Sequence, residues 1–205
     1  MKNKLEIIDD FLSDEDYNDL INNLKELELE EIYQLKEKKY DFMKSKNLDL
    51  TDEVFSLKYS ANSNIINEGT GKFIKKIETE IKKILDDNDI VFCTKYVVMR
   101  RGFNDHIRIH CDDYFSKIGY AFYTFDCDWK VDYGGLLHSV DNEYIETVVP
   151  KRNRLVMMDQ SDLYHWVTPV NSWAKNDRKC IVGFGLSEED AKQIEKNNGF
   201  IGDYK

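Results

Sequence analysis

Three side chains in the second half of the chain have the types and the spacing that can hold a metal ion. His110 and Asp112 are separated by one residue, so on a strand both would point to the same side. His165 lies on a later run that reads His-Trp-Val-Thr-Pro-Val. Two imidazoles and one carboxylate on adjacent strands can occupy one face of an octahedron. This leaves three positions for a bidentate co-substrate and O₂, which is the coordination that a non-haem iron oxygenase needs.

The other histidines do not extend this constellation. His106 and His138 have no partner at metal-binding spacing, and we expect each to lie in a loop or to face solvent. Asp113 directly follows Asp112 and would point to the other face of a strand. A His-x-Asp pair is weak evidence by itself, because so short a pattern is common. The case for iron therefore depends on the elements around it.

The chain changes from helical to extended periodicity after Asp89. One helix is predicted after Ser13, which forms a capping-box pattern with Asp16, and a second over residues 73–85 from its apolar spacing. Short runs rich in Val, Ile, Tyr and Phe then follow at residues 90–99, 107–110, 119–125, 136–140, 145–149, 154–158, 165–170 and 178–186. About eight such strands predict an α+β chain with a jelly-roll core, or double-stranded β-helix, built from two sheets.

A single domain accounts for the whole sequence of 205 residues. Its predicted parts are a helical N-terminal part at 1–89, the jelly-roll core at 90–186, and a short C-terminal helix and tail at 187–205. The polar stretch 36–71 has weak periodicity and turn residues at 62–64 and 69–71, so it is a candidate loop over the substrate. A structural excursion without a role in binding is the equal alternative.

Composition excludes several classes of protein. Asp and Glu outnumber Lys and Arg by 39 to 29, and the formal net charge of −10 argues against a general nucleic-acid binder. The basic stretches 100–101 and 151–154 are expected to be solvated strand ends. No apolar run approaches the roughly 18 residues of a membrane span, and no signal peptide is expected. The 4 cysteines are widely spaced, so we expect reduced thiols in a cytoplasmic protein.

A series of short motifs, in the same order, resembles the prolyl-4-hydroxylase-like 2-oxoglutarate and iron dioxygenases. The resemblance covers nearly the whole chain, from Ile7 to about Leu186. Its motifs are I-I-D-D-F-L-S at 7–13, H-C-D at 110–112, Y-T-F-D-C-D-W at 123–129, G-G-L-L at 134–137, P-K-R-N-R-L-V at 150–156 and H-W-V-T-P-V at 165–170. The common order of several independent motifs makes chance a poor explanation.

The resemblance implies that His110, Asp112 and His165 bind Fe(II). It also implies that a basic residue on the strand after the second histidine binds the distal carboxylate of 2-oxoglutarate, for which the fork of a guanidinium is well suited. Arg178 opens the last strand and is the predicted anchor. Lys175 is the competitor, because the spacing from His165 to Arg178 is longer than the family usually has.

Two positions depart from the family pattern around this anchor. Cys180, which shares the parity of Arg178 and should also face the barrel interior, replaces the usual Ser or Thr and is a weaker donor. Residues 99–102 replace a usual Tyr-x-x-Gly element, and a hydroxyl from Thr124 or Tyr123 could supply the missing donor. Candidate walls of the substrate site are Trp129 and Trp166.

The function that the resemblance implies is hydroxylation of a C–H bond with Fe(II), 2-oxoglutarate and O₂, with release of succinate and CO₂. Family analogy favours a prolyl residue in a peptide or protein, and a free amino acid or small metabolite is the alternative. Two rivals are a cupin-like metal-binding module that does not use 2-oxoglutarate and a non-catalytic β-sandwich that has kept the motif. The expected partner is the substrate, with no nucleic acid and no membrane, and no oligomeric state follows from the sequence.

Overall fold

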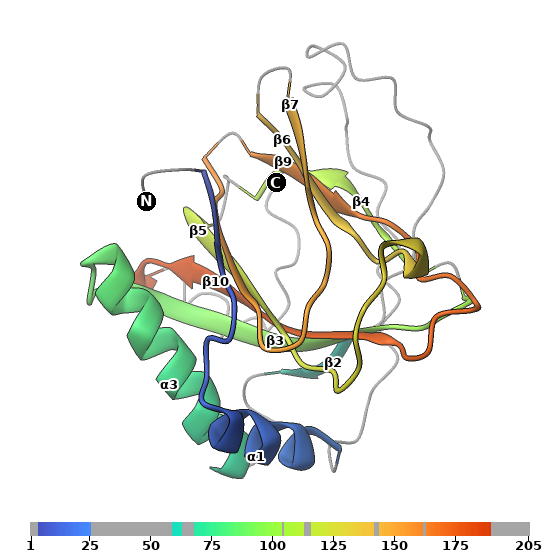
Figure 1. Cartoon of the computed structure of the whole chain (residues 1–205). Coiled ribbons are helices and arrows are strands. Elements are labelled where there is room, and N and C mark those ends of the chain that lie inside the picture. The colour runs from blue at the N-terminus through green and yellow to red at the C-terminus, as the bar shows by residue number, and fades with distance from the viewer. Residues whose placement is uncertain are drawn as a thin grey trace.

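The computed structural model describes residues 4–25, 59–62, 68–103, 105–112, 116–141, 144–161 and 163–189. Figure 1 shows the helices lying beside the strands, which form two sheets. In chain order the elements are β1 (Leu5–Ile8), α1 (Asp14–Lys25), β2 (Tyr59–Asn62), α3 (Glu68–Leu85), β3 (Val91–Met99), β4 (Ile107–His110), β5 (Ile118–Tyr123), the 3₁₀ helix η1 (Val131–Tyr133), β6 (Leu137–Asp141), β7 (Tyr144–Val148), β8 (Leu155–Asp159), β9 (Tyr164–Val167) and β10 (Arg178–Leu186).

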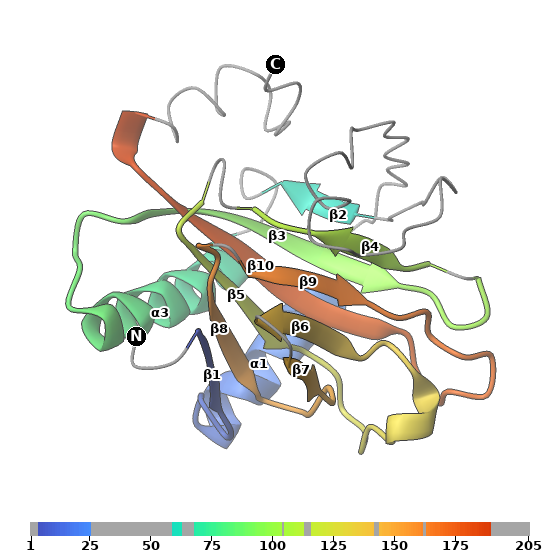
Figure 2. The ribbon, with the colours of Figure 1, turned by 90° about the horizontal axis from the view of Figure 1, so that it is seen from above.

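The strands form two sheets that lie one over the other (Figures 1 and 2). The major sheet has six strands in the order β1-β8-β5-β10-β3-β2, and the minor sheet has four in the order β4-β9-β6-β7. Every pairing between named strands is antiparallel. The predicted double-stranded β-helix is confirmed, and the eight core strands begin and end close to their predicted bounds.

Alternate residues of the major sheet pack into two separate cores. On β3, Tyr96 and Val98 belong to the core under the helices, whereas Val97 and Met99 belong to the core between the sheets. Strands β5, β8 and β10 alternate in the same way. This division follows from the strand period of two, because successive side chains point to opposite faces. The helix-facing core therefore joins the helices to the major sheet, and the inner core lies between the two sheets.

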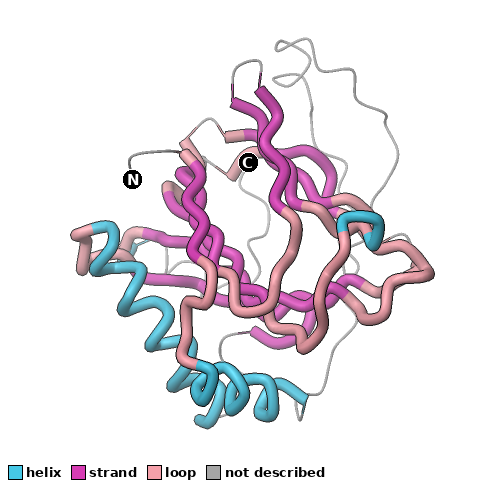
Figure 3. Tube along the Cα trace, in the orientation of Figure 1, coloured by secondary structure: helices cyan, strands magenta, loops and turns pink. Residues whose placement is uncertain are grey.

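Helices α1 and α3 cover one face of the major sheet (Figure 3). Each has a single apolar side, which for α1 consists of Tyr17, Leu20, Ile21 and Leu24, and for α3 of Phe73, Ile74, Ile77 and Ile81. Apolar residues at this spacing form one stripe on a helix, and the stripe is buried against the sheet. No helix in the described part of the chain is long and apolar enough to cross a membrane.

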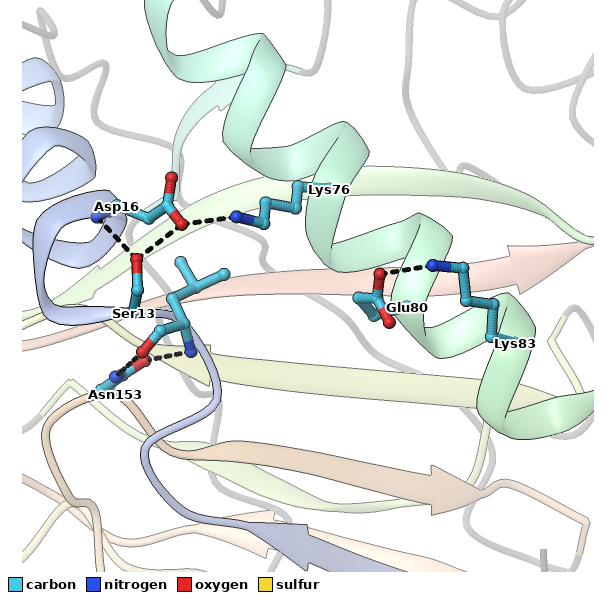
Figure 4. Close-up of polar contacts among 7 residues, drawn as sticks. Ser13, Asp16, Lys76, Glu80, Lys83 and Asn153 are labelled. Carbon is cyan, nitrogen blue, oxygen red and sulfur yellow. Dashed lines mark hydrogen bonds and ion pairs between the residues drawn. The ribbon is translucent and has the colours of Figure 1, made fainter.

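Ser13 caps α1, as its sequence pattern predicts (Figure 4). The N–H of Asp16 donates to Ser13 Oγ at 3.2 Å, and the Ser13 hydroxyl donates to the Asp16 carboxylate at 2.7 Å. Asp16 also forms an ion pair with Lys76 of α3. The cap satisfies one of the free N–H groups of the first turn, and the ion pair joins the two helices at the surface.

Parts of the N-terminal prediction differ from the structure. Residues 69–71 were expected in a loop but form the first turns of α3, where a Cβ at Gly71 would meet open space. Part of the predicted loop, 59–62, is strand β2, which pairs with β3. Ile84 is 42% exposed although it lies within the apolar spacing that predicted this helix. The rest of the candidate substrate loop 36–71 and the predicted C-terminal helix beyond residue 189 lie outside the described residues.

Residues of the basic stretch 151–154 form hydrogen bonds and ion pairs with the N-terminal motif. Asn153 is 1% exposed at a left-handed φ of 57°, and its amide exchanges hydrogen bonds with the backbone N–H and carbonyl of Leu12 at 2.9 and 2.7 Å (Figure 4). Asparagine tolerates this backbone conformation better than most residues. Arg154 donates to both carboxylate oxygens of Asp9 at 2.6 and 3.0 Å. These contacts fasten the N-terminal motif to the sheet core.

The other basic stretch, 100–101, is also engaged. Arg100 pairs with the buried Asp105 at 3.0 Å, and Arg101 donates to the carbonyls of Ala174 and Lys175 at 3.1 and 2.7 Å. Both stretches lie at strand ends, as predicted, and Arg101 and Lys151 are exposed, but the contacts of Arg100, Arg101 and Arg154 with other segments were not predicted. Arg100 and Arg101 connect the end of β3 to the loop before β4 and to the loop before β10.

Glu78 of α3 gives a pH-dependent prediction about stability. Its carboxylate accepts a hydrogen bond from the Thr94 hydroxyl at 2.5 Å, but burial raises the pKa of Glu78 above its ordinary value. The folded chain therefore keeps this proton at a pH where the unfolded chain has lost it. The free energy of unfolding is therefore highest below the pKa that Glu78 has in the unfolded chain. It falls as the pH rises through the higher pKa that Glu78 has in the folded chain.

We expect the Glu78→Gln variant, which keeps an acceptor and cannot ionise, to melt at a higher temperature than the wild type at pH 7. Each 1 kcal/mol recovered should raise Tm by roughly 2–4 °C. The difference should grow as the pH is raised from about 5 to 7, because only the wild type then ionises Glu78. Thermal melts across this range test it, and a difference that does not change with pH would contradict the assignment.

Candidate metal centre and co-substrate pocket

Strands β4 and β9 bring the two predicted histidine ligands together. His110 ends β4 and lies directly opposite His165 on β9, with the ring centroids 4.2 Å apart. Directly opposed residues of an antiparallel pair share a face of the sheet, so both imidazoles point to the same side. Asp112 follows β4 two residues after His110 and returns to that face.

The three side chains form one cluster. Their candidate ligand atoms all lie within 4.8 Å of one another. The Asp112 carboxylate oxygens are 3.6 Å from His110 Nε2 and 3.6 Å from His165 Nε2. His165 is 6% exposed and Asp112 4% exposed, so water has little access to two of the three groups. No other described group of His, Cys, Asp or Glu has a geometry that could hold a metal.

Burial keeps His165 in the protonation state that binds metal. Desolvation, with the neighbouring His110, lowers the pKa of His165 to about 3, so its imidazole is neutral at physiological pH. The Leu163 carbonyl lies 3.3 Å from His165 Nδ1. This contact fixes the tautomer in which Nε2 faces the cluster.

Asp112 provides the test of whether these residues fit a cation. Burial raises the pKa of its carboxyl, and His110 and the Gln160 amide oppose that effect only in part. Among the described residues its ion-pair neighbours are the two histidines, and no Lys or Arg side chain reaches it. A buried carboxylate without a basic partner is unfavourable unless a cation joins it. The donor set of two nitrogens and one carboxylate oxygen suits Fe(II).

Arg178 forms a second site inside the barrel. Its side chain is 2% exposed and no described carboxylate pairs with it. The guanidinium donates to the Gly135 carbonyl at 2.9 Å and to the Tyr123 hydroxyl at 3.2 Å, and its Nη1 lies 3.1 Å from Cys180 Sγ and 3.6 Å from Met99 Sδ. A buried guanidinium held by neutral groups is suited to a bound carboxylate, which would supply its missing charge partner.

The Gly134-Gly135 motif makes room for this side chain. Both glycines have a positive φ, at 72° and 63°. A Cβ at Gly135 would lie 2.9 Å from Arg178 Cδ, and one at Gly134 would lie 2.1 Å from the Pro169 carbonyl oxygen. Only glycine tolerates both the conformation and the close approach. The motif therefore positions the predicted anchor.

Of the other residues predicted to bind the co-substrate, some lie beside Arg178 and one does not. Tyr123 and Cys180 both contact Arg178, but Thr124 lies one residue further along and turns toward Tyr96 in the helix-facing core. Thr124 therefore has no place beside the anchor. Lys175 is exposed in the loop before β10, so it is not placed to compete with Arg178.

The two predicted tryptophan walls have different positions. Trp129 packs in the inner core, and its Nε1 donates to the Gly134 carbonyl at 2.9 Å, beside the anchor. Trp166 follows His165 and therefore points to the opposite face of the minor sheet. There it stacks on His138 at 5.0 Å between ring centroids. Trp166 is not a wall of the site, because strand alternation carries it away from the ligands.

Sequence reasoning missed two residues that contact the site. Met99 lies beside the anchor, and its position on the inner parity of β3 would have placed it there. Gln160 donates from Nε2 to Asp112 Oδ2 at 3.2 Å. It follows β8, in a loop without periodicity, so no local pattern could have indicated its direction.

The jelly-roll thus encloses a His-Asp-His cluster that suits a metal ion and a buried guanidinium that suits a carboxylate. Residues 93–185 match the sequence model of the 2OG-Fe(II) oxygenase superfamily. No curated protein sequence matches the chain. The match spans most of the sheet core and includes the His-Asp-His cluster, so this core is similar to that of the 2OG-Fe(II) oxygenases, a superfamily named for its use of 2-oxoglutarate and Fe(II).

Solved structures share the fold at low sequence identity. A prolyl hydroxylase from Trichoplax adhaerens, in complex with a peptide fragment of a hypoxia inducible factor, is 16% identical with a TM-score of 0.62, over 93% of this chain and 87% of that one. A Pseudomonas putida prolyl-4-hydroxylase is 14% identical with a TM-score of 0.59, over 90% and 93%. The α-ketoglutarate-dependent epimerase SnoN from nogalamycin biosynthesis is 9% identical with a TM-score of 0.62, over 90% and 78%.

Proposed function

We propose that this chain hydroxylates a prolyl residue in a peptide or protein, with Fe(II), 2-oxoglutarate and O₂. The observation that carries the proposal is the presence of two unsatisfied charges in one barrel. The Asp112 carboxylate lacks a cation and the Arg178 guanidinium lacks an anion among the described residues. A metal at the first and the distal carboxylate of a dicarboxylate at the second would satisfy both.

The roles of this chain's own residues follow from their positions. His110, Asp112 and His165 would hold Fe(II), which supplies O₂ activation when it is bound. Arg178, supported by Tyr123 and the Gly135 carbonyl, would bind and orient the far end of 2-oxoglutarate. The apolar side chains of the inner core around them exclude water, which strengthens both charge interactions.

The minor sheet supports a substrate of peptide size. His110 and His165 belong to a row of directly opposed residues across the minor sheet. The row continues through the buried Ser139 on β6 to the exposed Glu146 on β7. In the described part of the chain β7 is the edge of the sheet, and Tyr144 there is 78% exposed. An extended peptide could therefore pair with the exposed edge strand β7, in the same sheet as the two histidines. Two of the similar structures are named as prolyl hydroxylases, one with a bound peptide.

A small-molecule substrate is the second candidate. The similar structure SnoN is named as an epimerase of nogalamycin biosynthesis, so this fold also supports chemistry on metabolites. We also propose a cytoplasmic location without a nucleic-acid or membrane partner. The four cysteines form no disulfide with one another, and both basic stretches make internal contacts.

The first experiment is anaerobic titration of the purified chain with Fe(II) and then 2-oxoglutarate, followed by visible spectroscopy. A weak charge-transfer band is expected for the chelate. Succinate release under O₂ would then be compared for a prolyl peptide, the same peptide with alanine, and free proline. Turnover of the prolyl peptide alone supports the proposal. Turnover of free proline alone supports the small-molecule candidate, and no band with bound iron favours a module that does not use 2-oxoglutarate.

A further inference from the structure

We propose that Gln160 is a positioning residue, which holds the Asp112 carboxylate in the orientation that completes the metal centre. The proposal rests on the iron site described above. It concerns a residue outside the His-Asp-His cluster, in the loop between β8 and β9. Gln160 is 1% exposed, and its Nε2 donates to Asp112 Oδ2 at 3.2 Å.

The environment of the amide gives Gln160 a single useful orientation. Its Oε1 has no hydrogen-bond partner among the described residues. If the amide were turned over, this oxygen would face a carboxylate oxygen and the N–H₂ group would lose its acceptor. A buried amide with an unsatisfied carbonyl costs about 1–3 kcal/mol, so packing alone does not explain a glutamine here. Its one side-chain hydrogen bond is made to a metal ligand.

The backbone of Gln160 is fixed at both of its polar groups. Its N–H donates to the Lys117 carbonyl at 2.9 Å, just before β5. Its carbonyl accepts from the Cys111 thiol at 3.4 Å. Cys111 lies between His110 and Asp112 and points away from the ligands. The His-x-Asp segment is therefore tied to Gln160 twice, once through the middle residue and once through the carboxylate.

Gly119 on β5 provides the space that the Gln160 amide occupies. A Cβ at Gly119 would lie 2.3 Å from Gln160 Nε2 and 2.8 Å from its Cδ. The side-chain end of a glutamine can move away from such a clash at small cost, but it would then leave Asp112. Gly119→Ala should therefore break the same hydrogen bond as a substitution of Gln160, without touching either partner.

The hydrogen bond limits rotation of the carboxylate. One described hydrogen bond, from Gln160, reaches Asp112 Oδ2, and the remaining polar neighbours are the two histidines. Without it the carboxylate can turn away from the position that faces both imidazoles. Loss of an outer partner of a metal ligand typically weakens metal binding by about 10–100-fold.

The test measures Mn(II) affinity of the full chain by calorimetry, since Mn(II) replaces Fe(II) without redox chemistry. Gln160→Met keeps the volume and removes the donor. We expect its Mn(II) Kd to rise by roughly 10–100-fold, the Gly119→Ala Kd to rise to a similar extent, and the double variant to be no weaker than either. The matched control is Asn153→Ala, which removes another buried amide. It should lower Tm and leave the Mn(II) Kd unchanged.

Two results would overturn the positioning role. One is a Gln160→Met variant that binds Mn(II) within about twofold of the wild type; the other is a loss of affinity that Asn153→Ala reproduces. Effects of Gly119→Ala and Gln160→Met that simply add would also contradict it, because residues acting through one contact are not additive. A wild-type chain that binds neither Mn(II) nor Fe(II) would instead contradict the metal centre itself, and with it the proposed function.

Discussion

The Asp112→Ala variant is expected to fold and to lose Fe(II) affinity by at least roughly 10²-fold. Removal of one partner from a buried charge interaction costs about 3–5 kcal/mol, and each 1.4 kcal/mol is about tenfold in affinity. The metal-free variant should be more stable than the metal-free wild type, because it no longer buries a carboxylate that lacks a basic partner. Metal titration and melting curves with and without Fe(II) measure both effects.

Asp105→Ala is the matched control for this prediction. Asp105 is 1% exposed, like Asp112 at 4%, but it binds the side chain and the backbone N–H of Arg100. Its removal should lower Tm and leave Fe(II) affinity unchanged. If Asp112→Ala bound iron as the wild type does, the cluster would not be the metal site.

Replacement of Arg178 by alanine is expected to raise the KM for 2-oxoglutarate by roughly 10²-fold. Hydrogen bonds to a charged group contribute about 1.5–3 kcal/mol, and Arg178 offers a buried fork to a carboxylate. Fe(II) affinity without 2-oxoglutarate should not change, because the guanidinium makes no described contact with the metal ligands. Initial rates of succinate release at varied 2-oxoglutarate give the KM.

Two further variants separate the role of Arg178 from general damage to the core. Lys175→Ala should have a wild-type KM, because Lys175 is exposed in the loop before β10. Arg178→Lys keeps the charge and loses the planar fork, so its KM should lie between those of the wild type and Arg178→Ala. An unchanged KM in a folded Arg178→Ala protein would favour a metal enzyme that does not use 2-oxoglutarate.

The sequence predicted those features of the fold that local patterns determine. The strands were readable because the residues of each run alternate between two cores, as Val97 and Val98 do. His110 and Asp112 could be placed on one face by parity alone. Arg178 was preferred for its chemistry and its place at the start of β10, and the structure buries it inside the barrel.

The features that the sequence did not reveal depend on contacts between distant segments. Trp166 was predicted as a wall of the site, but strand alternation directs it away from His165, and it stacks on His138 instead. The direction of Thr124 depends on how the chain leaves β5, and the contact of Gln160 depends on a loop without periodicity. Residues 69–71 are helical although two glycines favour a turn, because packing of the rest of α3 outweighs local propensity.

The division of the major sheet into two cores has a practical consequence for engineering this enzyme. A mutant library restricted to the inner-core positions of β3, β5 and β10, with Tyr123 and Arg178 left unchanged, would vary the shape of the space between the sheets and leave the helix-facing core intact. A library on the complementary positions would sample thermal tolerance with that space unaltered. Screening the two libraries separately should therefore allow selectivity and robustness to be evolved in parallel and then recombined on the same strands.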